Sequence, residues 1–240
     1  MADLTGRQIT ILKHIIDEYI ETAKPVGSET LDKKFALGVS PATLRNEMVA
    51  LSKLGYLSQP HTSSGRSPTP EALKYYVTNL MQPKKMSVTD EVKIKEKVMD
   101  YKNEFEKALR EATKELADVT KSLAVSSDSE GDVYYSGTAN ILDMPEFFDI
   151  DLTRSVLSLF DHFDSVDKLF ARGTEDPGIQ VLLGADLGFD YLSPCAMVFT
   201  RFGLGKKNQG TIGVLGPCRL DYPKLIPTVR YFGDLIDQLE

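Results

Sequence analysis

Three short helical patterns with sharp ends follow one another in the first 55 residues, and they constrain the fold more than any other feature. The first begins at Thr5-Gly6-Arg7-Gln8, a capping-box pattern in which the Thr hydroxyl and the Gln side chain each satisfy a free backbone amide. Its apolar residues recur at steps of three and four, which gives one buried stripe that ends before Pro25. They are Ile9, Leu12, Ile15, Ile16, Tyr19 and Ile20.

The second and third helical patterns are separated by only a few residues. Ser28 is expected to cap a short helix, and Gly38 supplies a left-handed stop after it. Ser40 then precedes Pro41, an N-cap followed by a proline at the first helical position, and this helix is expected to run to Leu54. Two helices joined by a short turn containing Gly predict a helix-turn-helix.

The third helix has two contrasting faces. At 100° per residue, Leu44, Met48 and Leu51 point inward. The opposite face is small, hydrogen-bonding and basic, and consists of Ala42, Asn46, Val49 and Lys53, flanked by Thr43, Arg45 and Ser52. A solvated helix face usually carries Glu and Lys pairs, whereas these residue types suit close approach to the edges of bases.

A β hairpin is expected next. Residues 56–61 read as an extended segment, a polar turn with Gly65 and Arg66 follows, and residues 67–69 return. Arg66, expected at the tip, is suited to a minor groove or a phosphate. Thr69 then caps another helix that ends by Pro83. The order of three helices, hairpin and helix predicts a winged helix-turn-helix over residues 1–85.

The longest helical pattern covers residues 87–123. Its apolar residues step by three and four with one stutter, and its other faces carry Lys and Glu. We interpret residues 86–125 as a long amphipathic helix that links two domains and is a candidate for dimerisation. The alternative is an amphipathic helix packed on its own domain.

The remainder of the chain has mixed patterns. Residues 126–132 read as a polar break with no core-forming residue, and residues 151–170 have helical apolar spacing. Short strands are expected at 179–183, 195–202 and 211–215, the last two joined as a hairpin, and Asp221 is expected to cap a final helix with Pro227 inside it. Antiparallel strands with helices on one face predict an α+β domain over residues 133–240.

Composition and charge narrow the function classes. Residues 1–85 hold eleven Lys+Arg and eight Asp+Glu, a net of +3, and because the whole chain is −7, residues 86–240 carry −10. No apolar run is long enough to cross a bilayer, no secretory signal is visible, and two cysteines, Cys195 and Cys218, suit the reducing cytoplasm. We therefore expect a cytoplasmic protein in which residues 1–85 are suited to binding phosphates.

Catalytic and metal sites are not expected. His14, His61 and His162 share no ligand spacing, so no metal site is predicted. Acid–base catalysis is an alternative, because carboxylates gather in one segment, but no His or nucleophile has a partner at catalytic spacing. These carboxylates are Asp143, Glu146, Asp149 and Asp151. The chain is predicted not to be an enzyme and to need no cofactor.

Several blocks resemble one known family. The segments are PVGS (25–28), GVSPATLRNEM (38–48), LGYL (54–57), QPHTSSGRSPT (59–69), NILDMPEF (140–147), GTIGVLGP (210–217) and LDY (220–222). Together they are similar to HrcA, the bacterial heat-inducible transcription repressors. Members of that family are longer, with a GAF-like domain and an inserted dimerisation domain. The resemblance therefore implies a reduced GAF-like domain here, with little volume for a pocket.

The resemblance also implies a function and partners. It implies negative regulation of chaperone operons, binding of a double-stranded inverted-repeat operator called CIRCE as a homodimer, support by the chaperonin GroEL, and release on heating. A winged-helix repressor that responds to a small molecule in its C-terminal domain is the alternative.

On this hypothesis the DNA-binding residues lie on the third helix and the hairpin. They are Ser40, Ala42, Thr43, Arg45, Asn46, Val49, Lys53, His61, Ser64 and Arg66. We expect four of them to read bases, Ser40, Thr43, Arg45 and Asn46. The amides at the start of the helix are expected to hold phosphates, together with Thr43, Lys53, His61 and Ser64. Taken singly, each has another interpretation: Asn46 solvates the helix, Arg66 is a loop charge, and Arg45 pairs with Glu29 or Glu47.

Overall fold

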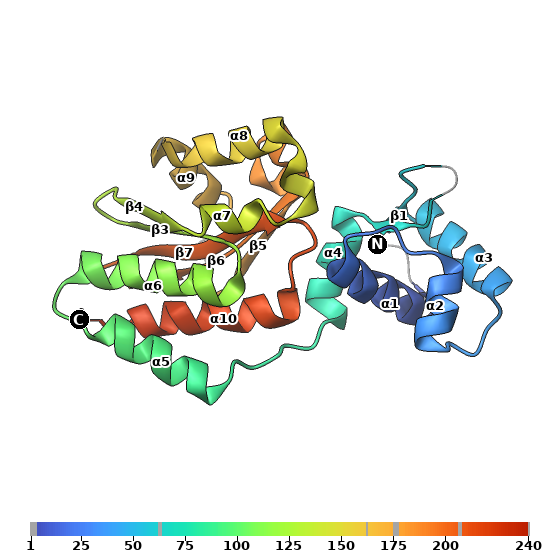
Figure 1. Ribbon diagram of the computed structural model, residues 1–240, viewed down its shortest axis with the longest axis horizontal. Helices are drawn as coiled ribbons and strands as arrows, with labels where there is room; N and C mark the ends of the chain where they lie inside the picture. Colours follow the sequence, from blue (N-terminus) through green and yellow to red (C-terminus); the bar gives the residue numbers. More distant parts are fainter. Residues whose placement is uncertain (1–3, 62–63, 162, 175–177, 206–207, 240) are drawn as a thin grey trace. The chain divides into compact units, whose positions relative to one another are not determined.

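The computed structural model describes residues 4–61, 64–161, 163–174, 178–205 and 208–239. The chain forms two compact units, residues 1–81 and residues 82–240 (Figure 1). The boundary lies four residues before the one expected, and the second unit includes the residues expected to form a separate linking helix. No helix of the described residues is both long and apolar enough to span a membrane.

The first unit contains the expected order of helices and hairpin. Its elements are α1 (Gly6–Thr22), α2 (Ser28–Phe35), α3 (Pro41–Lys53), β1 (Leu57–Ser58), β2 (Ser67–Pro68), α4 (Pro70–Tyr75) and a π-helical turn (Tyr76–Leu80). The strands β1 and β2 pair antiparallel. The apolar faces of the helices pack together to form the core of this unit. Its buried residues include Ile11, Leu12, Ile15, Ile16, Leu31, Leu44, Met48, Leu51, Leu73 and Tyr76.

Local capping explains why these helices begin where they do. The amide of Thr5 donates to Gln8 Oε1 at 3.0 Å and the amide of Gln8 donates to Thr5 Oγ1 at 3.3 Å, so the predicted capping box is confirmed. Ser28, however, does not cap α2. It is the buried first residue of the helix, and Gly27, in an extended conformation, occupies the N-cap position without a side-chain hydrogen bond.

The second unit is built on a five-stranded antiparallel sheet of order β4-β3-β7-β6-β5. The strands are β3 (Leu123–Asp128), β4 (Val133–Ser136), β5 (Gln180–Leu183), β6 (Cys195–Phe202) and β7 (Gly210–Pro217). The α+β class and the β6–β7 hairpin are confirmed. Residues 206–207 of its turn lie outside the described residues.

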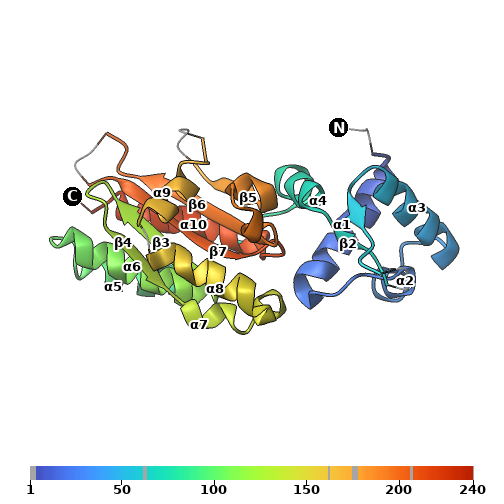
Figure 2. The same cartoon turned by 90° about the horizontal axis from the view of Figure 1, so that it is seen from above.

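Helices cover both faces of this sheet, so the expectation of helices on one face is wrong. Figures 1 and 2 show α6 (Phe105–Thr120) and α10 (Tyr222–Ile236) on one side, and α7 (Thr138–Ile141), α8 (Ile150–Ser158) and α9 (Phe163–Phe170) on the other. Both central strands are buried almost throughout. Alternate residues of a strand point to opposite faces, so a strand buried throughout needs a layer on each side.

The predicted long helix over residues 87–123 is wrong, because the helix breaks at residues 100–104. Helix α5 (Val88–Met99) ends there, α6 begins at Phe105, and the two pack against each other, with an ion pair between Lys97 and Glu115. Helix α6 lies on β3 and β4. The apolar stripe is thus buried within the second unit, which agrees with the alternative of a helix packed on its own domain.

The polar break expected at residues 126–132 is also wrong over its first half, because Ser126 and Ser127 belong to strand β3 and are buried. The Ser126 hydroxyl lies 2.6 Å from Thr113 Oγ1 on α6, and Thr113 Oγ1 donates to the Leu109 carbonyl at 2.7 Å. Hydroxyls that find partners inside the protein can be buried at little cost.

Of the last two predicted helices, the first is divided in two and the second is confirmed. Residues 151–170 form two helices rather than one, α8 and α9, separated by a 3-10 turn (Leu159–Asp161), and His162 lies outside the described residues. The final helix α10 is confirmed with Pro227 in its interior, although the Asp221 side chain at its N-cap accepts no capping hydrogen bond.

Candidate nucleic-acid interface

Helix α3 presents the predicted face to the surface. Leu44, Met48 and Leu51 are buried against the first unit's core. The opposite face is exposed, and consists of Ala42, Arg45, Asn46, Val49 and Lys53. The orientation follows from the helical spacing of the three apolar residues, because burying them leaves the other face outward.

The side chains of Arg45 and Asn46 are uncommitted. Within the described part of the chain neither makes a hydrogen bond or an ion pair. Glu47, one of the two partners considered for Arg45, instead lies 3.7 Å from Arg7 Nη1 and accepts from Gln8 Nε2 at 3.2 Å. The interpretation of Arg45 as half of an intramolecular ion pair is therefore wrong, and its guanidinium is free to meet a ligand.

The first turn of α3 is held by hydroxyls. Ser40 Oγ accepts from the amide of Thr43 at 3.2 Å and lies 3.0 Å from Thr43 Oγ1. Ser40 is exposed, whereas Thr43 is half-buried. Both side chains thus fix the start of the helix, and this cap sets the direction in which Arg45 and Asn46 leave it.

The hairpin after α3 also pairs with a third segment of the chain, the one between α1 and α2. Leu57 pairs with Pro68 and Ser58 with Ser67. On the far side of β2, Arg66 forms an antiparallel bridge with Val26, in which each amide donates to the other's carbonyl at 2.8 Å. The hairpin is therefore anchored to the segment between α1 and α2.

Arg66 does not lie at the hairpin tip, so that expectation is wrong. Its backbone is held in the bridge to Val26, and its half-buried guanidinium donates to Gln59 Oε1. Gln59 in turn donates from Nε2 to the Ser64 carbonyl at 3.2 Å. Arg66 is thus a positioned cation beside the strands rather than a loop charge.

The two remaining predicted residues of the hairpin lie nearer its tip. Ser64 Oγ accepts from the amide of His61 at 3.0 Å and donates to its carbonyl at 2.7 Å. The His61 side chain is exposed. Ser64 therefore shapes the turn, of which residues 62–63 lie outside the described part of the chain.

Gly65 is required by the close approach of the hairpin to the segment it bridges. A Cβ at this position would lie 2.4 Å from the Val26 carbonyl carbon and 2.8 Å from the Gly27 nitrogen. We expect Gly65→Ala to lower the free energy of unfolding of the first unit by about 1–3 kcal/mol, because the backbone has to shift to admit a methyl group.

Thermal unfolding followed by circular dichroism, together with amide exchange at Arg66, measures this effect. Gly6→Ala is the matched control, because a Cβ at Gly6 meets nothing within 4 Å. Equal stability of the two variants, with Arg66 still protected from exchange, would show that the bridge tolerates a side chain.

A groove of about 490 Å³ lies between the first turn of α2, the outer face of α3 and the hairpin. It brings together Arg45, Val49, Ser64 and Arg66 of the predicted residues. Ser40, Ala42, Thr43, Asn46, Lys53 and His61 do not line it. Ser28, Glu29, Thr30 and Gln59 line it and were not predicted. Only strand register reveals Gln59, because the pairing of Ser58 with Ser67 places it opposite Arg66.

Comparison with known proteins gives the family of the chain. Residues 70–226, more than half of the chain, match the family described as HrcA protein C terminal domain. The chain belongs to the HrcA family. HrcA proteins are transcription repressors, so this is a family of regulators rather than of enzymes.

Individual relatives carry the same name. The chain is 27% identical to the heat-inducible transcription repressor HrcA of Brevibacillus brevis over 335 positions, covering 98% of each chain. It is 28% identical to HrcA of Desulforudis audaxviator, covering 94% of each. Because 335 positions exceed the 240 residues of this chain, the Brevibacillus protein has residues with no counterpart here.

A solved structure shares the fold. It is described as a hypothetical protein, with a TM-score of 0.75 at 20% identity, covering 99% of this chain and 98% of that chain. At this identity the likeness concerns the fold alone.

Three of the four acidic residues considered for catalysis in this HrcA-family chain make hydrogen bonds or ion pairs. Glu146 accepts from Arg219 Nε at 2.6 Å, Asp149 Oδ1 caps α8 through the Asp151 amide at 2.9 Å, and Asp151 pairs with Arg154 at 3.0 Å. Within the described residues no group of three or more potential ligands could hold a metal ion.

The cysteines behave as interior residues. Cys195 is buried in β6, and Cys218 Sγ donates to its carbonyl at 3.0 Å. Burial raises the pKa of both thiols to about 12. Neither thiol is therefore ionised near neutral pH, which argues against a nucleophilic role.

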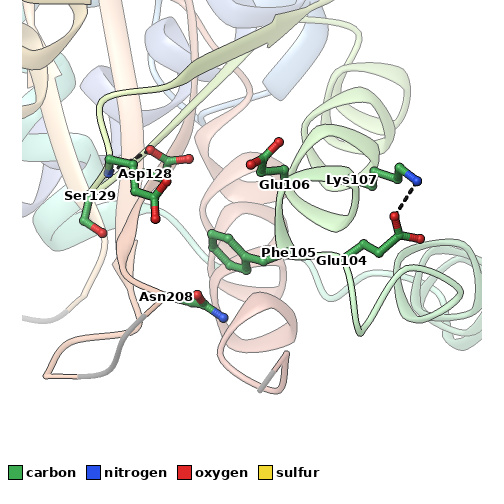
Figure 3. A pocket seen from close by; sticks show the side chains of 8 residues that line it. Glu104, Phe105, Glu106, Lys107, Asp128, Ser129 and Asn208 are labelled. Carbon is green, nitrogen blue, oxygen red and sulfur yellow. Dashed lines mark hydrogen bonds and ion pairs between the residues drawn. The ribbon is translucent and has the colours of Figure 1, made fainter.

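Of the hollows on the surface of the second unit, two exceed about 300 Å³. One, of about 330 Å³, is shown in Figure 3. Four carboxylates line it, those of Glu104, Glu106, Asp128 and Glu130, and Glu104 is paired with Lys107. Small-molecule sites are mostly apolar, and this hollow is not. Its negative charge also disfavours phosphate. The other hollow, of about 490 Å³, lies beside α8.

Proposed function

We propose that this chain represses transcription of heat-shock operons in the cytoplasm by binding an operator through its first unit, a winged helix-turn-helix. The observation that carries the proposal is that Arg45 and Asn46 are exposed on α3 without a hydrogen bond or ion pair among the described residues, and that Arg45 lines a groove together with the positioned Arg66. Helix α3 has the residues and the N-terminal cap of a helix that reads a major groove.

The contacts divide into those that read sequence and those that position the protein. Arg45 pairs with guanine and Asn46 with adenine, and the Val49 side chain meets a thymine methyl group. Lys53, His61 and Ser64 hold phosphates, as does the start of α3 with Ser40, Ala42 and Thr43. Arg66, whose guanidinium donates to Gln59 at the hairpin, contacts the DNA backbone at the edge of the major groove.

The operator is an inverted repeat bound by a homodimer. One winged helix contacts few base pairs, so two copies are needed to distinguish an operator within a genome, and two-fold symmetry of the protein demands a palindromic site. The HrcA resemblance names this site CIRCE. The net charge of +3 over residues 1–85 supports approach to DNA.

The second unit is the regulatory domain, a reduced GAF-like fold through which heat and the chaperonin GroEL act. Heating the purified protein with operator and then adding chaperonin tests this. Recovery of operator binding supports the heat-shock repressor, and recovery on adding a metabolite extract instead supports a small-molecule sensor. No DNA preference at any temperature contradicts both.

Lys53→Ala is expected to weaken operator and random duplex by the same factor and to reduce the slope of log affinity against log salt by about 1 unit. A lysine that binds a phosphate displaces about one counterion from the DNA and contacts no base. The loss of affinity on removing it therefore does not depend on the DNA sequence. Fluorescence anisotropy from low to moderate salt measures the slope.

The control for this variant is Lys93→Ala, an exposed lysine on α5 that has no partner among the described residues. It should leave the slope unchanged. A Lys53→Ala protein that loses affinity for the operator alone would show that Lys53 reads sequence instead.

A further inference from the structure

We propose that the N-terminus of helix α2 binds one phosphate group of the DNA backbone. The proposal rests on the proposed function for the source of the phosphate and adds a site that lies outside α3. Helix α2 begins at Ser28, and Gly27 occupies the N-cap position without a side-chain hydrogen bond. The first amides of a helix carry partial positive charge and point away from it, so they are suited to an anion.

The amides at the start of α2 lack acceptors. Leu31 is the first residue whose amide is satisfied within the helix, by the Gly27 carbonyl at 3.1 Å. The amides of Ser28, Glu29 and Thr30 precede it and make no hydrogen bond with a described residue. Residues 27–30 line the groove between α2, α3 and the hairpin, here called the α2 groove. Free donors at a helix start are satisfied by water or by a ligand, and the α2 groove is where a ligand reaches these three.

Neither the backbone nor the packing requires glycine at position 27. Its φ of −93° and ψ of 157° are extended angles that any residue adopts. Among the described residues, and apart from its chain neighbours, a Cβ placed there would meet only Thr30 Oγ1 within 4 Å, at 3.9 Å. A capping side chain would therefore fit and would accept from the α2 amides, as Ser40 accepts at the start of α3. Glycine leaves those amides available to a ligand.

The Ser28 hydroxyl is a second and independent indication of a ligand. The residue is only 7% exposed, yet its hydroxyl makes no hydrogen bond with a described residue. It is not sealed inside the protein either, since the fully enclosed polar side-chain atoms without a partner belong to other residues. Ser28 lines the α2 groove, so its hydroxyl opens there. A buried hydroxyl without a partner costs free energy, and a phosphate oxygen that accepts from it removes this cost.

The charges of the α2 groove suit an anion. Arg45 and Arg66 line it together with the start of α2, and the Arg66 guanidinium is positioned by Gln59. Glu29 carries the carboxylate among the described lining residues, and it is exposed and makes no ion pair with them. Two guanidiniums and a helix start outweigh one carboxylate, so the groove attracts negative charge.

A DNA duplex is the source of phosphate that the surroundings favour. The outer face of α3, which the proposed function places in a major groove, forms one wall of the α2 groove. The backbone strands of DNA run along both edges of a major groove, so phosphates lie beside any helix inserted there. A free phosphate compound has the same oxygen acceptors, and titration with inorganic phosphate distinguishes it.

Gly27→Asn should weaken binding to operator and to random duplex by the same factor, about tenfold. The Asn side chain accepts from the α2 amides in place of the phosphate, and a phosphate contact carries no sequence information. The unfolding temperature should stay the same or rise, because the new cap satisfies the helix. Fluorescence anisotropy with the full chain measures both affinities. Gly6→Asn is the matched control and should bind like the wild type, since a Cβ at Gly6 meets nothing within 4 Å.

Ser28→Ala should also weaken both duplexes about tenfold, as expected for the loss of a hydrogen bond to a charged group. Its unfolding temperature should not fall, because the hydroxyl has no partner among the described residues. Ser87→Ala is the matched control with the opposite result. Ser87 Oγ accepts from the Asp90 amide at 3.1 Å at the start of α5. Its removal should lower the unfolding temperature by about 2–4 °C and leave both duplex affinities unchanged.

Methylphosphonate substitution locates the contact. Replacing the operator phosphates one at a time by this uncharged group should find one position at which the wild type and Ser28→Ala bind equally well. A phosphate bound by both the amides and the hydroxyl must respond to both changes. Wild-type duplex affinity in Gly27→Asn or in Ser28→Ala, or no such position, therefore overturns the contact with the DNA backbone.

Titration of the full chain with inorganic phosphate, without DNA, separates the two sources of the group. Chemical shifts of the Glu29 and Thr30 amides report binding, which should be weak in the wild type and absent in Gly27→Asn. Phosphate binding that Gly27→Asn abolishes, together with unchanged duplex affinity, supports a free phosphate compound as the ligand and overturns the DNA backbone. No binding of either ligand at these amides overturns the site.

The failure of this proposal and the failure of the operator function give different results. A wild type without preference for the operator, whose affinity for random duplex falls in both variants, refutes the operator function and leaves the α2 site standing. A wild type that prefers the operator and keeps its affinity in both variants does the reverse.

Discussion

Arg45→Ala should lower the preference for operator over random duplex by about 10- to 100-fold, while affinity for random duplex falls far less. One bidentate contact between arginine and guanine contributes ~1–3 kcal/mol of discrimination, and 1.4 kcal/mol corresponds to a factor of ten. The Arg45 side chain is exposed and makes no hydrogen bond or ion pair with other described residues, so its removal costs the fold little.

Competition binding measures this effect, with labelled operator displaced by unlabelled operator or scrambled duplex at one fixed salt concentration. Arg230→Ala, at an exposed arginine of α10, is the matched control and should leave both affinities unchanged. Equal losses on the two duplexes would mean that Arg45 holds phosphate, and base reading would then rest on Asn46 and Val49.

Phe199→Ala should lower the free energy of unfolding of the second unit by about 3–5 kcal/mol. The side chain is fully buried in β6, and its ring lies 5.3 Å from that of Phe170. Its Cβ also packs on Gly213 of β7, where a methyl group would come within 2.4 Å. Because the strand and α9 hold the walls apart, the truncation leaves a cavity that cannot collapse.

Urea unfolding followed by tyrosine fluorescence and circular dichroism measures the loss, since the chain has no tryptophan. Val92→Ala, at a half-exposed apolar residue of α5, is the control and should cost less than 0.5 kcal/mol. Half-site binding by folded Phe199→Ala protein should match the wild type if the first unit reads DNA by itself. A loss below about 1 kcal/mol would show that β6 and α9 repack.

The starts of α1 and α3 and the buried face of α3 were predictable because their causes are local. The Thr5 and Gln8 groups that close α1 are three residues apart, as are Ser40 and Thr43 at α3. The buried side of α3 follows from the spacing of Leu44, Met48 and Leu51. Such interactions can be recognised before any long-range contact is known.

The errors share a different cause, which is contact between segments far apart in the chain. Arg66 was expected at a loop tip, but a backbone bridge to Val26, forty residues earlier, and the side chain of Gln59 place it in the groove. Ser126 has the composition of a loop, yet the hydroxyl of Thr113 on α6 allows it to lie in a core strand.

The sequence determined the helices of the first unit, the exposed residues of α3, the β6–β7 hairpin and membership of the HrcA family, because short-range capping, periodicity and ordered motifs specify them. Tertiary structure alone decided that α5 and α6 fold back on the sheet, that helices cover both of its faces, and that Phe148 and Ile150 remain outside. Burial depends on which distant surfaces meet, and periodicity shows that a face is apolar without showing what covers it.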